Sequence, residues 1–312
     1  MKSFMLTRRD GGALAGYRSG TSGPVLALAN GLGGPVSAFR HQIAHFEGRY
    51  RVVTWDYRGL YASRGGAAPA RVDVAAQAED LEDLLRSETN EPAVVVGWSM
   101  GVQVALELVR SAPARVSALV LISGAYGRPL TNLRVPRAER WLPDLIERVR
   151  PYHHVGARLL ARATRSRTMF DLVRRLRFVH PRIATDELLS LAREFTELDF
   201  DVYLRTLAGL ERHDTAAALR TVKQPTLVVA GERDPLFSPR LARDLTLRLP
   251  NAELYVVPGA THYAPLEFPE LVNARADGFL AESARHGGSS PRADPLTLPA
   301  LERENPGLRT LE

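Results

Sequence analysis

Ser99 lies at the centre of a Gly-x-Ser-x-Gly pentapeptide, residues 97–101. The apolar run Ala93–Val96 before it predicts a strand, and the pattern of Val102–Val109 after it predicts a helix. A serine on so sharp a turn projects its hydroxyl out of the backbone, and the flanking glycines remove Cβ atoms that would clash. The pentapeptide therefore predicts a serine nucleophile at a helix N-terminus, where backbone N–H groups favour developing negative charge.

A serine hydroxyl is a weak nucleophile unless a base takes its proton and a third group orients that base. Asp234 and His262 each lie in a loop after an apolar run that predicts a strand, residues 226–230 and 252–257. They are the candidates for the orienting carboxylate and the base. Glu232 is an alternative carboxylate, and seven other histidines compete with His262, but only His262 lies in the loop directly after the last predicted strand.

The order serine, aspartate, histidine and the strand that precedes each resemble the alpha/beta-hydrolase superfamily, over about residues 4–280 with one insertion. Residues 25–34 are similar to the family's strand and oxyanion loop, and residues 51–59 to the next strand and its turn. The resemblance implies that the backbone N–H groups of Leu32 and Met100 form an oxyanion hole. It also favours Asp234 as the carboxylate, because Asp234 completes the family's Gly-x-x-Asp pattern.

Two departures from the family pattern bear on the substrate. Asn30 stands where many relatives have a histidine before the first glycine, and Tyr61 stands where a glycine is common. The Tyr61 ring would narrow the mouth of the pocket. Together with Gly31 and Trp98, these two residues are the predicted substrate contacts.

The elements that must position these residues alternate between strand and helix signals. Residues 3–7 and 13–17 predict an opening hairpin, residues 36–46 and 74–85 predict helices, and residues 116–122 predict a further strand. A chain of 312 residues with 45% hydrophobic content can bury a large core. The expected class is α/β, a mostly parallel sheet flanked by helices, and the resemblance implies the alpha/beta-hydrolase fold with an inserted helical cap.

A gap of about 95 residues interrupts this alternation, far longer than an ordinary connection. The predicted organisation is a core in two parts, 1–125 and 216–284, a helical cap at 126–215, and a mobile or loosely docked tail at 285–312. Three sets of apolar residues at helical spacing support a cap. Most of their side chains are expected to pack between a cap helix and the core. Their members are Val155, Leu159, Leu160 and Ala163; Met169, Phe170, Leu172, Val173 and Leu176; and Leu188, Leu189, Leu191 and Ala192.

An aromatic-rich stretch follows these faces, and some of its side chains are expected to face the cleft. A lining of this kind would exclude water and accept an apolar acyl or ring group. Its members are Phe195, Leu198, Phe200, Tyr203, Leu204 and Leu207.

Positive charge is concentrated in one region of a chain whose net charge is +6: residues 128–182 hold fourteen arginines and four acidic residues. Such a face could bind peripherally to an acidic membrane surface, or it could attract an acyl carrier protein or a carboxylated substrate. The simpler interpretation is a solvated arginine-rich face, since the whole chain uses arginine in place of lysine. No nucleic-acid module accompanies the charge, so nucleic acid is not an expected partner.

Composition excludes several classes of chemistry. The chain has no cysteine, which rules out disulfides, thiol catalysis and thiolate metal sites. The eight histidines lack metal-binding spacing, so we expect no metal and no other cofactor. No run approaches the roughly 18 apolar residues of a transmembrane helix, and no secretory pattern follows the start. These features predict a cytoplasmic protein.

The predicted chemistry is acyl transfer through a covalent intermediate on Ser99, and the predicted reaction is hydrolysis of a small apolar carboxylic ester. The same groups serve lactones, thioesters and carbon–carbon bonds next to a ketone, so these alternatives stay open. A noncatalytic protein that binds a small ligand in the capped pocket is a second class of hypothesis. A third is an interaction protein recruited through the basic cap.

Overall fold

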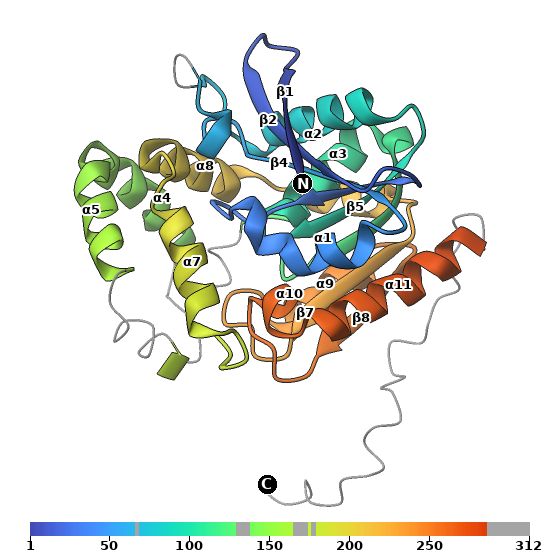
Figure 1. Cartoon of the computed structure of the whole chain (residues 1–312). Coiled ribbons are helices and arrows are strands. Elements are labelled where there is room, and N and C mark those ends of the chain that lie inside the picture. The colour runs from blue at the N-terminus through green and yellow to red at the C-terminus, as the bar shows by residue number, and fades with distance from the viewer. Residues whose placement is uncertain (66–68, 129–137, 165–173, 176–178, 286–312) are drawn as a thin grey trace, which may run out of the picture.

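An eight-stranded sheet forms the centre of the protein (Figure 1). The structure, a computed structural model, describes residues 1–65, 69–128, 138–164, 174–175 and 179–285. The strand order is β1-β2-β4-β3-β5-β6-β7-β8. The strands are β1 (Lys2–Thr7), β2 (Ala13–Ser19), β3 (Val25–Ala29), β4 (Arg51–Trp55), β5 (Ala93–Trp98), β6 (Val116–Ile122), β7 (Thr226–Gly231) and β8 (Ala252–Val257).

Most of the sheet is parallel, as the sequence predicts. β1 pairs antiparallel with β2, and β2 antiparallel with β4, while the remaining neighbours pair in parallel. Every residue of β3, β5 and β7 is buried. The sequence of a parallel strand that is covered on both faces is a continuous apolar run. These strands could therefore be located from their sequence.

Helices cover both faces of the sheet and form a separate hydrophobic cluster on each. Leu81 of α2, Leu108 of α3 and Leu245 of α9 belong to one cluster, and Phe46 of α1 and Phe279 of α11 belong to the other. These helices are α1 (Arg40–Phe46), α2 (Val74–Glu88), α3 (Met100–Ser111), α9 (Pro239–Arg248) and α11 (Pro269–Arg285), and a short helix, α10 (Ala264–Glu267), precedes α11.

The helix predicted over residues 36–46 is divided in two. A 3₁₀ turn, η1 (Val36–Phe39), precedes α1. Phe39 leaves the helical region of backbone angles, with φ −99° and ψ 13°, so the α-helix begins only at Arg40. The spacing of apolar residues in this segment does not indicate where the backbone angles change.

The segment between β6 and β7, called the helical insertion below, contributes helices that gather at one side of the sheet (Figure 1). Its two ends meet: Gly127 and Asp214 form an antiparallel bridge, and the Thr215 N–H donates to the Tyr126 carbonyl at 2.8 Å. The insertion therefore leaves the core and returns at one point. Its helices include α4 (Ala138–Val149), α5 (His153–Ala163), α7 (Thr185–Phe195) and α8 (Phe200–Arg212).

The apolar faces predicted within the insertion differ in their burial. α7 buries Leu188, Leu189 and Leu191, as expected. Val155 and Leu159 of α5 are 45% and 65% exposed, so the prediction that they pack on the core is wrong. α5 lies at the outer edge of the molecule, where it packs against α8 (Figure 1). The face that contains Met169 and its neighbours, and the predicted tail from residue 286, lie outside the described residues.

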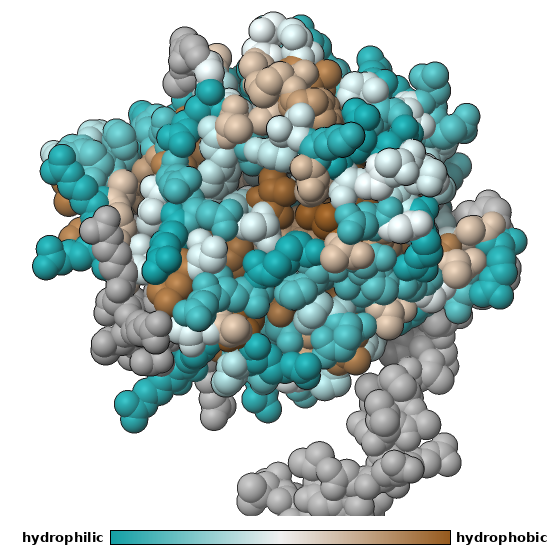
Figure 2. Space-filling model, in the orientation of Figure 1, coloured by the Kyte–Doolittle hydropathy of each residue, from teal (hydrophilic) through white to brown (hydrophobic). Residues whose placement is uncertain are grey.

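The face seen in Figure 2 has a mixed hydropathy, and hydrophilic side chains surround its small apolar areas. Part of the arginine-rich region is paired within the protein: Arg150 bonds Glu147 and Asp201, and Arg182 bonds Glu270. This pairing agrees with the simpler interpretation of the positive charge, a solvated face. Within the described residues, no helix is both long and apolar enough to cross a bilayer.

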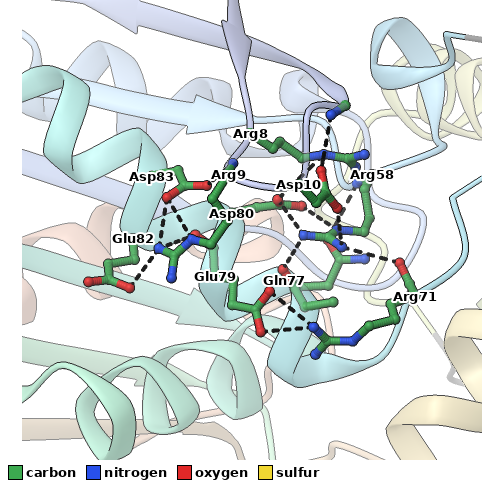
Figure 3. A network of polar contacts seen from close by, with 12 residues as sticks. Arg8, Arg9, Asp10, Arg58, Arg71, Gln77, Glu79, Asp80, Glu82 and Asp83 are labelled. Carbon is green, nitrogen blue, oxygen red and sulfur yellow. Dashed lines mark hydrogen bonds and ion pairs between the residues drawn. The ribbon is translucent and has the colours of Figure 1, made fainter.

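A buried ion pair joins α2 to the segment after β4 (Figure 3). The Arg58 guanidinium donates to both carboxylate oxygens of Asp80 at 2.7 and 2.6 Å, and the two side chains are 2% and 1% exposed. Arg58 also donates to the Ala76 carbonyl. Arg8, from the turn between β1 and β2, lies 3.9 Å from Asp80. The pair thus connects the hairpin, β4 and α2.

Replacing Asp80 by alanine is expected to destabilise the protein by about 3–5 kcal/mol, because the buried Arg58 guanidinium would lose its buried partner and keep only the half-exposed Asp10, 3.3 Å away, as a counter-charge. Glu79, the residue of α2 just before Asp80, provides a control, since it pairs with a half-exposed Arg71. Its replacement by alanine should change stability by less than about 1 kcal/mol. Denaturant unfolding of both variants checks this. Equal losses would contradict the role assigned to the buried pair.

Candidate active site

Ser99 occupies the turn between β5 and α3 with unusual backbone angles, φ 56° and ψ −116°. A non-glycine residue reaches this region only when its surroundings force it, and such strain is concentrated at functional sites. A Cβ on Gly97 would lie 2.4 Å from the Gly101 carbonyl oxygen, and one on Gly101 would lie 2.0 Å from that of Ala29. Both flanking glycines are therefore required by close backbone contacts, as predicted.

Ser99, His262 and Asp234 form a continuous chain of hydrogen bonds. His262 Nε2 lies 3.1 Å from Ser99 Oγ, and His262 Nδ1 lies 3.0 Å from Asp234 Oδ2. The three residues come from the loops after β5, β8 and β7. The structure thus brings together all three residues predicted from the sequence, although they are far apart in the chain. This is the geometry that a base needs to take the proton of a serine hydroxyl.

The Asp234 carboxylate is fixed by its own loop. Its side chain is fully buried, and its Oδ1 accepts the N–H groups of Leu236 and Phe237 at 2.8 and 2.9 Å. Its other oxygen remains for His262. Glu232, the alternative carboxylate, accepts the Gly259 N–H at 2.7 Å instead. The geometry therefore favours Asp234 over Glu232 as the partner of the imidazole.

The His262 imidazole packs between aromatic rings. Its centroid lies 5.4 Å from that of Phe237 and 6.1 Å from that of Trp98. The Trp98 indole N–H also donates to the His262 carbonyl at 3.0 Å. Trp98 immediately precedes Ser99, so one side chain of the nucleophile turn holds the backbone of the histidine loop. These contacts restrict the imidazole to the orientation that faces both Ser99 and Asp234.

The predicted oxyanion donors flank the serine. Gly31 approaches Ser99 so closely that a Cβ on it would lie 3.3 Å from the Ser99 Cβ. Within the described residues, the Leu32 amide donates no hydrogen bond. Met100 is the first residue of α3, where the amides have no acceptor in a preceding turn. Both N–H groups are therefore available to a negatively charged oxygen beside Ser99.

Asn30 and Tyr61 shape the oxyanion loop and do not line the cavity beside Ser99. The Asn30 amide donates to the carbonyls of Gly34 and Pro35 at 3.0 and 2.7 Å, and its oxygen accepts the Gly31 N–H at 2.8 Å. The Tyr61 hydroxyl donates to the Gly33 carbonyl at 2.6 Å. The polar groups of these two predicted substrate contacts are thus used within the loop, and neither residue belongs to the described cavity wall.

A cavity of about 650 Å³ opens onto Ser99 and His262. Trp98 and Gly31, two of the predicted substrate contacts, line it, and so do side chains of the helical insertion. None of the described lining residues is an aspartate, glutamate, lysine or arginine. The described lining comprises Gly31, Leu32, Gly33, Gly34, Pro35, Ala38, Trp98, Ser99, Ala163, Thr164, Val179, Leu188, Leu191, Ala192, Phe195, Tyr203, Leu207, Leu210, Leu236, Phe237, His262, Tyr263 and Leu266.

Two tyrosine hydroxyls of the cavity wall, those of Tyr203 and Tyr263, stay uncharged near neutral pH. Burial raises the pKa of the Tyr203 hydroxyl to about 12, and burial also raises the pKa of Tyr263. Both therefore present neutral hydroxyls. Phe195, Tyr203 and Leu207 belong to the aromatic-rich stretch and do face the cleft, as expected for some of its members.

Sequence analysis missed several lining residues. Leu236 and Phe237 follow Asp234 within three positions, and Tyr263 follows His262 directly. Their positions next to the catalytic candidates in the sequence could have been used to predict them, because neighbouring residues of a short loop stay close in space. Val179 carries no such signal, since it reaches the cavity from the distant insertion.

Comparison with known proteins identifies the family. The model of the alpha/beta hydrolase family matches residues 26–275. The chain therefore belongs to the alpha/beta hydrolase family, and the mostly parallel sheet flanked by helices is the fold of that family. The fold class and the superfamily resemblance expected from the sequence are confirmed.

Individual relatives differ in length and in name. The chain is 31% identical over 288 residues to polyketide synthase ThaQ of Burkholderia thailandensis; the match covers 90% of the chain but only 13% of that protein. It is 24% identical to RutD of Agrobacterium fabrum, named as a candidate carbamate hydrolase, over 84% of the chain and 95% of the relative. A thermophilic esterase structure from Thermogutta terrifontis matches with a TM-score of 0.70 at 23% identity, covering 90% of the chain and 98% of the esterase.

Proposed function

We propose that the protein is a serine hydrolase that cleaves carboxylic esters with an apolar acyl or ring group. The observation that carries the proposal is the hydrogen-bonded chain from Ser99 through His262 to Asp234, which opens into an apolar cavity. In this proposal Ser99 is the nucleophile, His262 is the general base and acid, and Asp234 orients the imidazole. The Leu32 and Met100 amides form the oxyanion hole.

In the first half of the proposed reaction, Ser99 Oγ attacks the ester carbonyl carbon while its proton passes to His262 Nε2. The carbonyl electron pair moves onto the oxygen, which accepts hydrogen bonds from the two oxyanion donors. The tetrahedral intermediate then collapses and the bond to the alkoxy oxygen breaks. His262 Nε2 returns its proton to that oxygen, and the alcohol leaves an acyl group on Ser99.

The second half repeats these steps with water. A water molecule loses a proton to His262 Nε2 as its oxygen bonds to the acyl carbon. Collapse of the second tetrahedral intermediate breaks the bond to Ser99 Oγ, which recovers the proton from His262. The acid product is released, and Asp234 stabilises the imidazolium that forms in each half. A cavity wall of apolar groups strengthens these electrostatic contacts, because it excludes bulk water.

The helical insertion acts in this proposal as a cap, residues 126–215, over a core formed by residues 1–125 and 216–284. Its support is that residues of α7 and α8 share the cavity wall with Ser99 and His262. The absence of charged side chains among the described lining residues favours an uncharged, apolar acyl or ring group. A carboxylated substrate is disfavoured for the same reason.

Lactones, thioesters, carbamates and carbon–carbon bonds next to a ketone remain alternative substrates, since the same acyl chemistry applies to them. A noncatalytic ligand-binding protein is less well supported. A pocket closed by Tyr61 and Trp98 would favour it, but Tyr61 is not part of the described cavity wall, and Ser99 is.

Hydrolysis of p-nitrophenyl esters of increasing acyl length tests the proposal. We expect turnover that depends on Ser99 and rises with acyl length until the chain fills the 650 Å³ cavity. Turnover on lactones or thioesters, with none on any ester of the series, would move the substrate class to those alternatives. Tight binding of a long-chain ester without turnover on any of these compounds would favour the noncatalytic hypothesis.

Replacing Ala192 of α7 by phenylalanine is expected to move the preferred acyl length to shorter esters, because Ala192 lines the cavity and the added ring occupies acyl space. The kcat/KM for the longest accepted ester should fall by about 10-fold or more, in line with 1–3 kcal/mol per misfitted group. Ser190→Phe adds the same ring to an exposed position of the same helix and should leave the preference unchanged. A profile shifted equally by both substitutions would argue against this cavity as the acyl site.

A further inference from the structure

A buried carboxylate lies behind the histidine loop, outside the catalytic chain. Glu267, the last residue of α10, is 1% exposed. Its carboxylate accepts three hydrogen bonds: from the Thr261 N–H at 2.6 Å, from the Thr261 hydroxyl at 2.5 Å, and from the His180 N–H at 2.8 Å. Two of the donors belong to the histidine loop, and the third belongs to the helical insertion.

The first two contacts act on the position of the imidazole. Thr261 precedes His262 directly, so Glu267 holds the backbone on one side of His262 while the Trp98 indole holds its carbonyl on the other. With the backbone held at these two points, the imidazole lies 3.1 Å from Ser99 Oγ and 3.0 Å from Asp234 Oδ2. A displacement of about 1 Å in such a geometry can reduce a reaction rate by about 10²-fold.

The third contact joins the insertion to the same carboxylate. His180 follows Val179, which lines the cavity. The His180 ring lies 5.0 Å from the ring of Phe268, the residue after Glu267, and the Arg182 guanidinium lies 4.8 Å from the same ring. This segment of the insertion therefore rests on α10 and the start of α11, directly behind the histidine loop.

The chemistry of Glu267 suits this position. Within the described residues, three donors, the Thr261 N–H and hydroxyl and the His180 N–H, satisfy this buried carboxylate, and no ion pair includes it. An ionised carboxylate is an acceptor at both oxygens, whereas an amide presents an N–H group at one of them. Glutamine at this position would turn a donor toward either Thr261 or His180, and one of those contacts would be lost.

We propose that Glu267 is a positioning residue: through Thr261 it holds His262 within hydrogen-bond distance of Ser99, and through His180 it fixes the insertion segment that lines the cavity. This assignment rests on the proposed function of Ser99 and His262. Glu267 contacts neither substrate nor the reacting atoms, so it acts only through the residues that it holds.

The first test is Glu267→Gln. We expect kcat on the preferred ester to fall by about 10- to 100-fold, with a smaller change in KM, because Ser99, the oxyanion donors and most of the cavity wall are left in place. The rate of Ser99 labelling by a fluorophosphonate should fall in parallel, since it requires the same activation by His262. Glu270→Gln is the matched control: it removes an exposed pair with Arg182 across the same boundary and should leave kcat within about twofold.

A second pair of variants separates positioning from folding. Thr261→Val keeps the shape of the side chain but removes the hydroxyl, whereas Thr261→Ser keeps the hydroxyl. We expect the valine variant to lose about 10-fold in kcat and the serine variant to recover most of the wild-type value. All rates are measured well below the midpoint of thermal unfolding of each variant, so that loss of folded protein does not contribute.

The outcomes are distinct. A folded Glu267→Gln variant with kcat within twofold of wild type overturns the proposal, and so do equal rates for Thr261→Val and Thr261→Ser if Glu267→Gln fails to fold. Wild-type turnover that does not depend on Ser99 overturns the proposed function itself. Ser99-dependent turnover with unaffected Glu267 and Thr261 variants overturns the positioning role alone.

Discussion

Ser99→Ala is expected to lower kcat by about 10⁵- to 10⁶-fold, the largest effect that we predict for any single substitution. The substitution removes the atom that forms the covalent intermediate, so the reaction would have to proceed by direct attack of water. The residual rate would reflect the oxyanion donors and substrate binding alone. Steady-state kinetics on the preferred ester measure the loss, and a fluorophosphonate that labels the wild type should leave the variant unlabelled.

Ser123 offers a closely matched control. It also follows a strand of the sheet, has a positive φ of 45°, and is buried with a hydroxyl that has no hydrogen-bond partner within the described structure. Ser123→Ala should therefore retain activity within a few-fold of wild type, because no hydrogen bond is lost. A fully active Ser99→Ala enzyme would exclude the covalent mechanism, whatever the behaviour of the control.

Asp234→Asn should produce the second-largest loss, about 10⁴-fold in kcat. The asparagine oxygen can still accept the Leu236 and Phe237 N–H groups, so the loop is expected to keep its shape. The amide N–H group then faces His262 Nδ1 and favours the tautomer that carries its proton on Nε2. An imidazole in that state cannot accept the proton of Ser99.

Glu232→Gln distinguishes the two carboxylates of this loop. Among the described residues, Glu232 accepts a hydrogen bond from the Gly259 N–H alone and forms none with His262. Its conversion to glutamine, which keeps one carbonyl oxygen, should change kcat by no more than about threefold. If Glu232→Gln instead gave the larger loss, the orienting carboxylate would be Glu232, and the assignment of Asp234 would have to be abandoned.

Local patterns were sufficient to predict the sheet and the three candidate catalytic residues. The strands β3, β5 and β7 could be recognised because a parallel strand covered on both faces is apolar along its whole length. The serine turn could be recognised because its two glycines are demanded by backbone contacts within that turn and with the adjacent Ala29. Once the order of strands was clear, Asp234 and His262 followed from their places after β7 and β8.

Side-chain contacts between distant segments could not be predicted in this way. Asn30 and Tyr61 are predicted substrate contacts. The sequence does not show that the polar groups of both side chains bond to carbonyls of the oxyanion loop. The spacing of Val155 and Leu159 indicates a helix, but the same spacing occurs whether the apolar face is buried or exposed.

Glu267 illustrates the difference most clearly. Its sequence position, five residues after His262, gives no sign that its carboxylate is buried against Thr261 and against His180 of the insertion. The periodicity of apolar residues indicates the average environment of a segment, and a motif such as Gly-x-Ser-x-Gly indicates the backbone geometry that one turn requires. Which polar groups meet across the boundary between core and insertion depends on how the two pack, and only the tertiary structure decides that.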